Sequence, residues 1–314
     1  PLQGDNLSLE GRKPVPQGLD EDVSILQEPL QNIYLVASGA MDMFASLDAV
    51  DQIRFSGQKQ ENWYIQTAKD AMAAGDMIYA GKYSKPDYEL LVSEGCDLAI
   101  ENRMITHSPE VVEMLESFDI PVMIEYSSYE HHPLGKVEWV KFFGALTGKE
   151  AKAEEAFAEQ TEILEEVESG EKTGKTIAFF YVTSNGLIQV RQSTDYIPKL
   201  IELAGGRYIF ENLEDSGSGR STLNMQVEDF YAGAKDADIL IYNSSIDGGV
   251  TTVDELIGKC NILKDFKAVQ EGQVYCTTND MYQQSMAIGY LLQDMHTVLT
   301  DDDTAKLRYL FLLQ

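Results

Sequence analysis

The folded part of the chain opens with Ile33-Tyr34-Leu35-Val36-Ala37, an apolar run that ends in Ser38-Gly39. Short apolar runs bounded by turn-forming residues are typical of buried strands. A helical stretch from about Met41 to Val50 follows, and then a short strand-like segment, Gln52–Phe55. This order of strand, helix and strand predicts a parallel sheet that is flanked by helices.

The same alternation continues through the first half of the chain. After a longer polar connection, the expected elements are a helix near Pro86–Glu94, a strand at Asp97–Ile100, a helix near Pro109–Phe118 and a strand at Pro121–Glu125. Strands and helices that alternate at these lengths build one α/β layer structure. Residues 31–134 are therefore interpreted as an N-terminal lobe.

The second half of the chain repeats this order of elements. Strands are expected at Thr176–Val182, Arg207–Phe210, Asp238–Tyr242 and Gln273–Thr277. Helices are expected near Asp195–Leu203, near Val227–Ala234 and between Val253 and Phe266. The repetition predicts a C-terminal lobe over residues 171–314, so the fold class is α/β with two similar lobes of mainly parallel sheets.

Residues 135–170 form a different kind of segment between the two lobes. Apolar residues recur there at helical spacing, and the remaining positions are mostly strong helix formers. We expect a single long connecting helix, about 45 Å for thirty residues, that bends at Gly144 or at Thr147-Gly148. A stiff connection of this kind predicts modest closure of the lobes. Residues 1–30 are polar with interspersed Gly and Pro, and are interpreted as a tether.

The charge balance excludes one class of partner. The chain has 24 Lys and Arg against 52 Asp and Glu, a formal charge of −28. Such a field repels phosphate backbones, so nucleic-acid binding is not expected. No apolar run reaches the roughly 18–20 residues of a membrane helix, and membrane contact is expected only through an anchor or a partner protein.

The sequence offers no clear catalytic motif. Three cysteines, Cys96, Cys260 and Cys276, are scattered without a C-x-x-C pair, and they are interpreted as small buried apolar residues. No G-x-S-x-G nucleophile motif is present. A two-lobed enzyme or cofactor-assembly protein of nitrogenase-like architecture stays open as an alternative, and it would need several Cys or His ligands where the lobes meet.

Histidines are few, and two of them are adjacent. His131 and His132 lie in a polar segment, and neighbouring residues of an extended chain point to opposite faces. We interpret them as polar loop residues that cap the following helix. A receptor for a bare divalent metal, using His107, His131 or His132 with a carboxylate, stays open as a second alternative.

Several segments together resemble a known family. They are Ile33–Ser38 with Ala45–Ile53, Lys85–Leu91 with Asp97–Ile100, His132–Trp139, Ile201–Gly206, and Val227–Phe230 with Asp238–Ile241. In this order they resemble the periplasmic binding proteins with a rigid connecting helix, which capture ferric siderophores, haem and vitamin B12 for ABC importers. The resemblance implies an extracytoplasmic receptor, either periplasmic or a cell-surface lipoprotein. It also implies a monomer without enzymatic activity or a cofactor of its own.

The resemblance also implies a role for two carboxylates. In the family, one Glu at the tip of each lobe docks onto arginines of the membrane permease, and by position these are Glu89 and Glu228. An acidic side chain near a helix N-terminus is favoured by the helix dipole and can accept a bidentate arginine.

Ligands of such sheets lie against the loops at the carboxyl ends of the strands. The expected ligand-binding residues of the first lobe are Met41, Tyr83, Asn102, Arg103 and Tyr126. Those of the second lobe are Arg191, Asn243, Asn279, Asp280 and Tyr282. Aromatic and methionine side chains hold a flat macrocycle, and arginine pairs with its carboxylates.

The cargo is expected to be a metal chelate. Its identity stays open between an iron chelate, either a siderophore or haem, and a corrinoid. Anionic siderophores call for several basic residues, and the candidates are few: Arg103, Arg191 and Lys82. Haem would use a Tyr, His or Met axial ligand.

Overall fold

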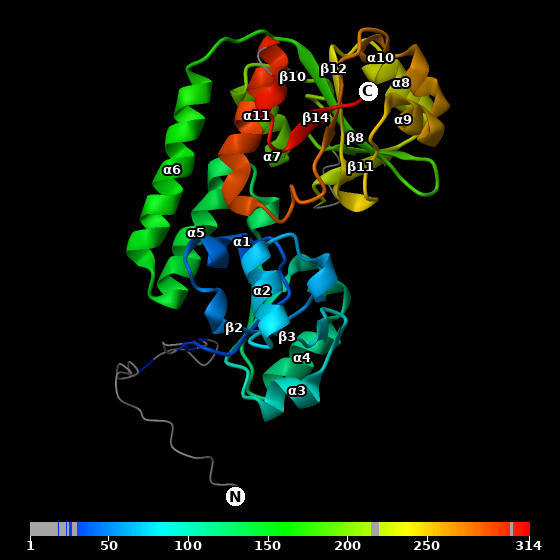
Figure 1. Cartoon of the computed structure of the whole chain (residues 1–314). Coiled ribbons are helices and arrows are strands. Elements are labelled where there is room, and N and C mark those ends of the chain that lie inside the picture. The colour runs from blue at the N-terminus through cyan, green and yellow to red at the C-terminus, as the bar shows by residue number, and fades with distance from the viewer. Residues whose placement is uncertain (1–17, 19–22, 24, 27–29, 215–219, 302–303) are drawn as a thin grey trace, which may run out of the picture. The chain divides into compact units, whose positions relative to one another are not determined.

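The computed structural model describes residues 18, 23, 25–26, 30–214, 220–301 and 304–314 (Figure 1). The tether expected over residues 1–30 lies largely outside the described residues. The chain divides into two units. The first unit comprises Pro1–Glu125 and Lys141–Ala153, and the second comprises Tyr126–Val140 and Glu154–Gln314.

The first unit contains a five-stranded, fully parallel sheet in the order β3-β2-β1-β6-β7. Its strands are β1 (Ile33–Leu35), β2 (Ile53–Ser56), β3 (Ile78–Tyr79), β6 (Leu98–Asn102) and β7 (Val122–Glu125). A small antiparallel pair, β4 (Gly81–Lys82) and β5 (Lys85–Pro86), follows the edge strand β3. The first strand of the sequence thus lies at the centre of the sheet, as parallel crossover connections allow.

Helices cover both faces of this sheet. They are α1 (Ala40–Ser46), α2 (Gln66–Ala74), α3 (Tyr88–Ser93) and α4 (Pro109–Ser117). Leu91 of α3 and Leu115 of α4 pack against Tyr34 and Phe55 in one buried cluster. Because side chains alternate along a strand, Ile33 and Leu35 face the opposite side of the sheet from Tyr34.

The second unit contains a seven-stranded mixed sheet in the order β11-β9-β8-β12-β13-β14, and β10 also pairs with β8. Its strands are β8 (Thr176–Val182), β9 (Ile188–Arg191), β10 (Arg207–Tyr208), β11 (Thr222–Met225), β12 (Ile239–Tyr242), β13 (Val274–Thr277) and β14 (Leu310–Leu312). The pairs of β8 with β10 and β12, and of β12 with β13, are parallel. The pairs β8–β9, β9–β11 and β13–β14 are antiparallel.

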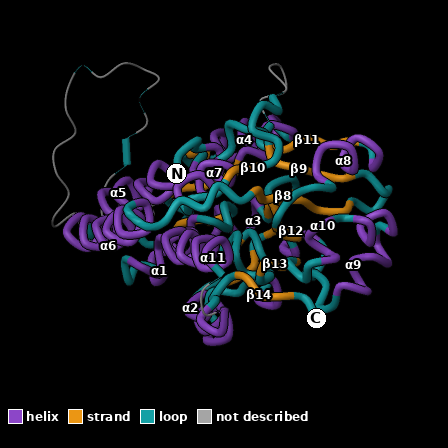
Figure 2. The backbone as a smooth tube through the Cα atoms, turned by 90° about the horizontal axis from the view of Figure 1, so that it is seen from above, coloured by secondary structure: helices purple, strands orange, loops and turns teal. Residues whose placement is uncertain are grey.

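The helices of the second unit lie on both faces of this sheet (Figure 2). They are α7 (Tyr196–Leu203), α8 (Val227–Ala234), α9 (Val253–Lys259), α10 (Lys267–Gln270) and α11 (Ile288–Thr300). On the α8–α10 face, Phe230 stacks on Phe266 with ring centroids 5.5 Å apart and contacts Phe180 of β8. Large aromatic side chains of this kind supply much of the apolar area that a core buries.

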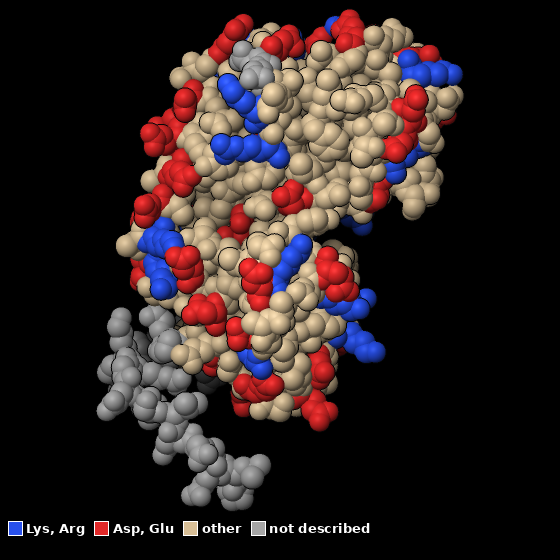
Figure 3. Space-filling model, in the orientation of Figure 1, with Lys and Arg blue, Asp and Glu red and all other residues tan. Residues whose placement is uncertain are grey.

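The segment between the lobes is helical, as expected, and it consists of two helices. They are α5 (Pro133–Thr147) and α6 (Glu150–Glu168). The expected single helix is interrupted because Gly148 adopts a left-handed conformation with φ of +67°. At the turn a Cβ on Gly144 would lie 2.5 Å from Ala153 Cβ, so glycine permits the close approach of the chain. Figure 3 shows acidic side chains along the exposed side of α6.

Short 3-10 helices complete the connections. They are Val50–Gln52, Gln60–Asn62, Arg103–His107, Ser127–Tyr129, Ser244–Ile246, Asn261–Asp265, Ser285–Ala287 and Thr304–Lys306. None of the helices in the described residues has the length and apolarity needed to cross a membrane.

The predicted fold class is confirmed: the structure is α/β, with two lobes of mainly parallel strands flanked by helices and a long helix, α6. The sequence did not predict the antiparallel strands β9, β11 and β14, or the helices α2 and α11. The expected helix over residues 41–50 ends earlier, at Ser46, because Asp48 takes a positive φ of 50° and turns the chain.

Candidate functional site

In the second unit, two polar loops at the carboxyl ends of neighbouring strands are held together. Asn243 and the 3-10 helix Ser244–Ile246 follow β12, and Thr278–Gln284 follow β13. The amide of Ser244 donates to Thr277 Oγ1 at 2.9 Å, and the Ser244 hydroxyl donates to the Thr277 carbonyl. These bonds fix the start of one loop against the end of the adjacent strand.

Three of the expected ligand-binding residues meet in this place. Asn243 Nδ2 donates to the hydroxyl oxygen of Tyr282 at 2.8 Å, and Arg191 Nη2 donates to the same oxygen. The Arg191 guanidinium carbon lies 5.3 Å from the centroid of the Tyr282 ring. We call Arg191, Asn243 and Tyr282 the Tyr282 cluster. Because the phenol oxygen accepts two bonds, its own proton is available for a further acceptor.

Arg191 is a buried member of this cluster. Its Nη1 lies 3.3 Å from Asp195 Oδ2, and these two side chains are 10% and 1% exposed. The hydroxyl of Tyr208 clamps the Arg191 backbone, accepting from its amide at 3.0 Å and donating to its carbonyl at 2.8 Å. Burial raises the pKa of Asp195, and the neighbouring Arg191 opposes that rise. The guanidinium therefore serves Asp195 and Tyr282, and the expectation that it pairs with ligand carboxylates finds no support in its contacts.

Asp195 also caps the N-terminus of α7. Its Oδ1 accepts the amide of Ile197 at 3.0 Å, so it is the N-cap of that helix. A side-chain oxygen in this position satisfies one of the amides that every helix leaves unpaired. The ion pair with Arg191 thus connects the end of β9 to the first turn of α7.

The remaining expected residues of the second unit are more accessible. Asn279 is exposed and Asp280 is half-buried, in the loop that follows β13. Tyr126, which the sequence assigned to the first lobe, belongs to the second unit by the division of the structure and is 41% exposed. Its ring packs edge-on against Tyr129 at a centroid distance of 6.4 Å, and the two rings form a solvent-facing aromatic surface.

In the first unit, Asn102 and Arg103 are at the end of β6, and both are half-buried. Asn102 Oδ1 accepts the amide of Met104 at 2.9 Å and starts the following 3-10 helix. Tyr83 is half-buried in the turn between β4 and β5. Met41 is fully buried in α1 and offers no surface to a ligand, because the helix directs its side chain into the interior.

One unusual residue of the first unit was not singled out in the sequence. Glu101 on β6 is fully buried, and neither of its carboxylate oxygens has a hydrogen-bond partner among the described residues. Desolvation raises the pKa of Glu101 to about 8. The signal in the sequence is a Glu that directly continues the apolar strand Leu98–Ile100.

The two expected docking carboxylates occupy matching places. Glu89 and Glu228 are exposed, and each is the second residue of its helix, α3 and α8 respectively. Helix α3 leads into β6, which pairs with the first strand of its sheet, β1. Helix α8 leads into β12, which pairs with β8, the first strand of the second sheet. The two side chains are therefore equivalent in the topology of their units.

The histidine pair does not form a joint metal site. His131 Nδ1 lies 2.6 Å from the carbonyl of Thr194, whereas His132 Nδ1 accepts the amide of Leu134 at 3.2 Å. His132 thus caps helix α5, as interpreted from the sequence. Burial, followed by the charge of Lys199, lowers the pKa of His132. Within the described part of the chain, no group of three His, Cys, Asp or Glu side chains could hold a metal ion.

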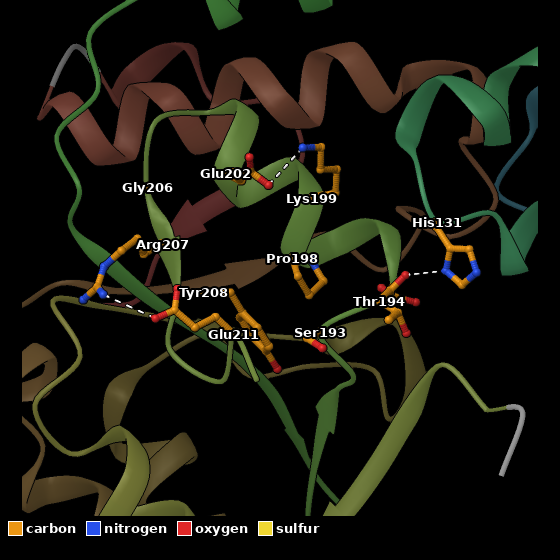
Figure 4. Close-up of a pocket in the computed structure, with 11 residues that line it drawn as sticks. His131, Ser193, Thr194, Pro198, Lys199, Glu202, Gly206, Arg207, Tyr208 and Glu211 are labelled. Atoms are coloured by element: carbon orange, nitrogen blue, oxygen red, sulfur yellow. Dashed lines mark hydrogen bonds and ion pairs between the residues drawn. The ribbon is translucent and has the colours of Figure 1, made fainter. Parts of the chain in front are cut away.

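A surface pocket of about 360 Å³ lies beside α7 and β10 of the second unit (Figure 4). Four of its charged side chains are paired within the pocket: Lys199 with Glu202 at 2.9 Å and Arg207 with Glu211 at 3.5 Å. A fifth, Asp195, is paired with Arg191. His131 lies at its rim. The pocket contains none of the residues that the sequence predicted for ligand binding, and its paired charges leave no net attraction for an ion.

Comparison with known proteins agrees with this architecture. Residues 37–281 match the family described as periplasmic binding protein. An uncharacterized lipoprotein of Methanocaldococcus jannaschii is 25% identical over 304 residues, which cover 91% of this chain and 70% of the relative.

Two solved structures share the fold. One is a possible iron-binding (periplasmic solute-binding) protein of Staphylococcus epidermidis, with a TM-score of 0.65, 17% identity, and coverage of 86% of this chain and 98% of that one. The other is a periplasmic haem-binding protein of Vibrio cholerae, with a TM-score of 0.67, 14% identity, and coverage of 85% and 98%. At these identities the likeness concerns the fold. The sequence match over most of its length, together with the two-lobed α/β architecture, shows that the chain belongs to the periplasmic binding protein family.

Proposed function

We propose that this protein is the extracytoplasmic receptor of an ABC importer, which captures a metal chelate and delivers it to the permease. The observation that carries the proposal is the matched pair of exposed acids. Glu89 and Glu228 stand at the same helical position in two units whose central parallel strands, β2-β1-β6-β7 and β10-β8-β12-β13, follow the same order. A repeated acid of this kind suits a partner that presents two arginines, since each carboxylate can accept a bidentate guanidinium.

Cargo is proposed to bind at the loops that follow the parallel strands. The Tyr282 cluster and Asn279 of the second unit, together with Tyr83, Asn102 and Arg103 of the first, support this assignment. Open α/β sheets bind ligands at the carboxyl ends of their strands. An iron chelate is the first candidate, because two proteins of the same fold are described as iron-binding and haem-binding. A corrinoid is the alternative, and amide and phenol groups such as those of Asn243 and Tyr282 favour it.

A lipid-anchored, cell-surface or periplasmic location is part of the proposal. The M. jannaschii relative is described as a lipoprotein, which supports it. A bare divalent metal is a weaker candidate for the cargo, because His131 and His132 contact separate backbone groups. Reversible binding without chemical turnover of the cargo is expected.

The docking role is tested with the double variant Glu89→Gln, Glu228→Gln. It should retain its affinity for cargo but reduce stimulation of the ATPase of the cognate permease complex in nanodiscs by at least about tenfold, because two charge-assisted hydrogen-bonded contacts are lost. The matched control is Glu113→Gln, Glu271→Gln, which removes two exposed acids elsewhere on the two units. Full stimulation by the docking variant would reject the assignment of these residues.

A further inference from the structure

We infer that the cargo is an uncharged chelate whose outer surface presents carbonyl or amide groups, and not a polyanion. This inference rests on the proposed function and narrows it. The observation behind it is the chemistry of the carboxyl edge of the second sheet, where the described residues offer many neutral hydrogen-bonding groups and no net positive charge.

Of the loops that follow the parallel strands of the second unit, three are described in full: residues 183–187 after β8, residues 243–252 after β12 and residues 278–287 after β13. The described residues after β10, 209–214 and 220–221, carry Glu211, Glu214 and Arg220, so they add no net positive charge. The three fully described loops contain no Lys or Arg, and their only acidic side chains are Asp247 and Asp280. Asp247 is neutralised by Lys259 at 2.7 Å and also accepts from Tyr242 at 2.9 Å. The remaining charge of these loops is that of Asp280, and it is negative.

Arg191 does not supply the missing positive charge. It is paired with the buried carboxylate of Asp195 and bonded to Tyr282, and its side chain is 10% exposed. If a ligand carboxylate took this guanidinium, the buried Asp195 would lose its ion pair, which is strongly unfavourable. The pair is therefore electrically neutral as seen by a ligand.

The groups that remain are neutral donors and acceptors. Arg191 and Asn243 donate to the hydroxyl oxygen of Tyr282, so the hydroxyl proton can still be donated to a ligand. Asn279 is exposed in the same loop. Phenol and amide groups match carbonyls and amides on a ligand without a charge on either side. The half-buried ring of Tyr282 also offers an aromatic surface to a flat or apolar body.

In the first unit the loops after β1 and β6 carry Arg103 as their one Lys, Arg, Asp or Glu side chain, and Lys59 and Glu61 after β2 form an ion pair at 3.9 Å. The segment after β7, which belongs to the second unit, carries Glu130. Lys82 and Lys85 lie in the β4–β5 pair beyond the edge strand, and both are exposed, so water and salt screen their charges. In the described loops that follow the parallel strands of the two units, the arginines are Arg103 and Arg220, and Glu130, Glu211 and Glu214 oppose their charge, within a molecule of net charge −28.

Isothermal titration with two ferric complexes of similar octahedral shape tests the inference. A ferric trihydroxamate is neutral and a ferric tricatecholate carries three negative charges. Cyanocobalamin, which is neutral, and haem, which carries two propionates, complete the panel. At least one neutral probe should bind at least about 30-fold more tightly than the tricatecholate in low salt, and added salt should narrow the ratio.

Two charge-reversal variants test whether the charge of these loops determines the ratio of the two affinities. Asp280→Lys should shift the ratio of the two affinities by about five- to tenfold toward the tricatecholate, because it replaces the negative charge of the loops by a positive one. Glu271→Lys makes the same change at the opposite end of β13 and should leave the ratio unchanged within about twofold.

The outcomes separate the two levels of the proposal. If the tricatecholate or haem binds as tightly as the neutral complexes, or more tightly, the inference is overturned while the receptor function stands. If no metal chelate of the panel binds, the proposed cargo class itself is rejected, and the inference falls with it.

Discussion

At the scale of single residues, the main peculiarity is a carboxyl group placed where water cannot reach it. Glu101 is surrounded by the cluster that contains Tyr34 and Ala99, and its pKa is raised to about 8 from an ordinary value of 4.5. The folded state therefore holds this proton at pH 7, whereas the unfolded state releases it.

The sign of the pH dependence follows from that difference. Glu101 imposes no cost below about pH 4.5, where both states are protonated. The free energy of unfolding then falls as the pH rises toward 8, and the loss is complete above that value. At pH 7 the loss is about 3 kcal/mol, from about 1.4 kcal/mol for each unit of pH. Glu101→Gln keeps the neutral form at every pH and should remove the loss.

Urea unfolding at pH 5 and at pH 8 measures this effect. The difference between Glu101→Gln and the parent protein should grow from near zero to a few kcal/mol over that interval. Glu116→Gln, at an exposed position on α4, serves as the control and should show no such growth. Parallel pH profiles for Glu101→Gln and the parent would contradict the buried-proton account.

At the scale of elements, the turn between α5 and α6 depends on one backbone conformation. Gly148 has a φ of +67°, and a Cβ placed there would meet no atom within 4 Å. The cost of replacing it is therefore conformational strain without a steric clash. Gly258 offers a contrast, since it lies in helix α9, is exposed, and also has open space around its Cα.

The two glycines should respond to alanine in opposite directions. Gly148→Ala should lower the free energy of unfolding by about 1 kcal/mol, because alanine is strained at positive φ. Gly258→Ala should raise it by about 0.5–1 kcal/mol, because alanine favours the helix. Thermal and urea unfolding measure both. A loss of stability for Gly258→Ala, or none for Gly148→Ala, would contradict the assigned conformations.

The elements also show what the sequence could and could not predict. Short, continuously apolar runs between helical segments predicted the central parallel strands, because such strands are buried on both faces of the sheet. The antiparallel strands β9, β11 and β14 were missed, since short antiparallel strands depend on pairing with other segments that local pattern does not reveal. Helix α2 was missed for a related reason: apart from Met72 its residues are polar or alanine, and Ala68 is its only fully buried residue.

The candidate site was predictable in part. Loop position after a strand was enough to place Asn243 and Tyr282 together, and both were expected. The partnership of Arg191 with Asp195 could not be predicted, because it depends on how β9 meets the first turn of α7. The burial of Met41 could not be predicted either. It depends on which side of α1 faces the interior, and a helix of seven residues is too short for its apolar pattern to define that side.

At the scale of the whole molecule, the dominant property is the surplus of acidic side chains. The formal charge is −28, and acidic side chains are spread over the face drawn in Figure 3. Mutual repulsion among them favours an expanded chain and opposes the folded one, although it keeps the protein soluble. Salt bridges such as Arg54 with Glu94 at 2.8 Å, on the surface of the first unit, offset little of it.

Salt should therefore stabilise this protein. Raising NaCl from about 20 mM to about 500 mM at pH 7 should increase the melting temperature by a few degrees, because the Debye length falls from roughly 20 Å to roughly 4 Å. At pH 5, closer to the sequence pI of about 4.3, the same addition should have a smaller effect. An equal effect at the two pH values would show that repulsion is not the cause.

Because Glu101 on β6 takes up a proton when the first unit folds, the pH of the buffer affects the folding equilibrium. Near neutrality the chain must collect about one hydrogen ion from its buffer each time the first unit forms, and must return it on denaturation. The first unit should therefore fold most favourably in mildly acidic surroundings, and alkaline surroundings should weaken it.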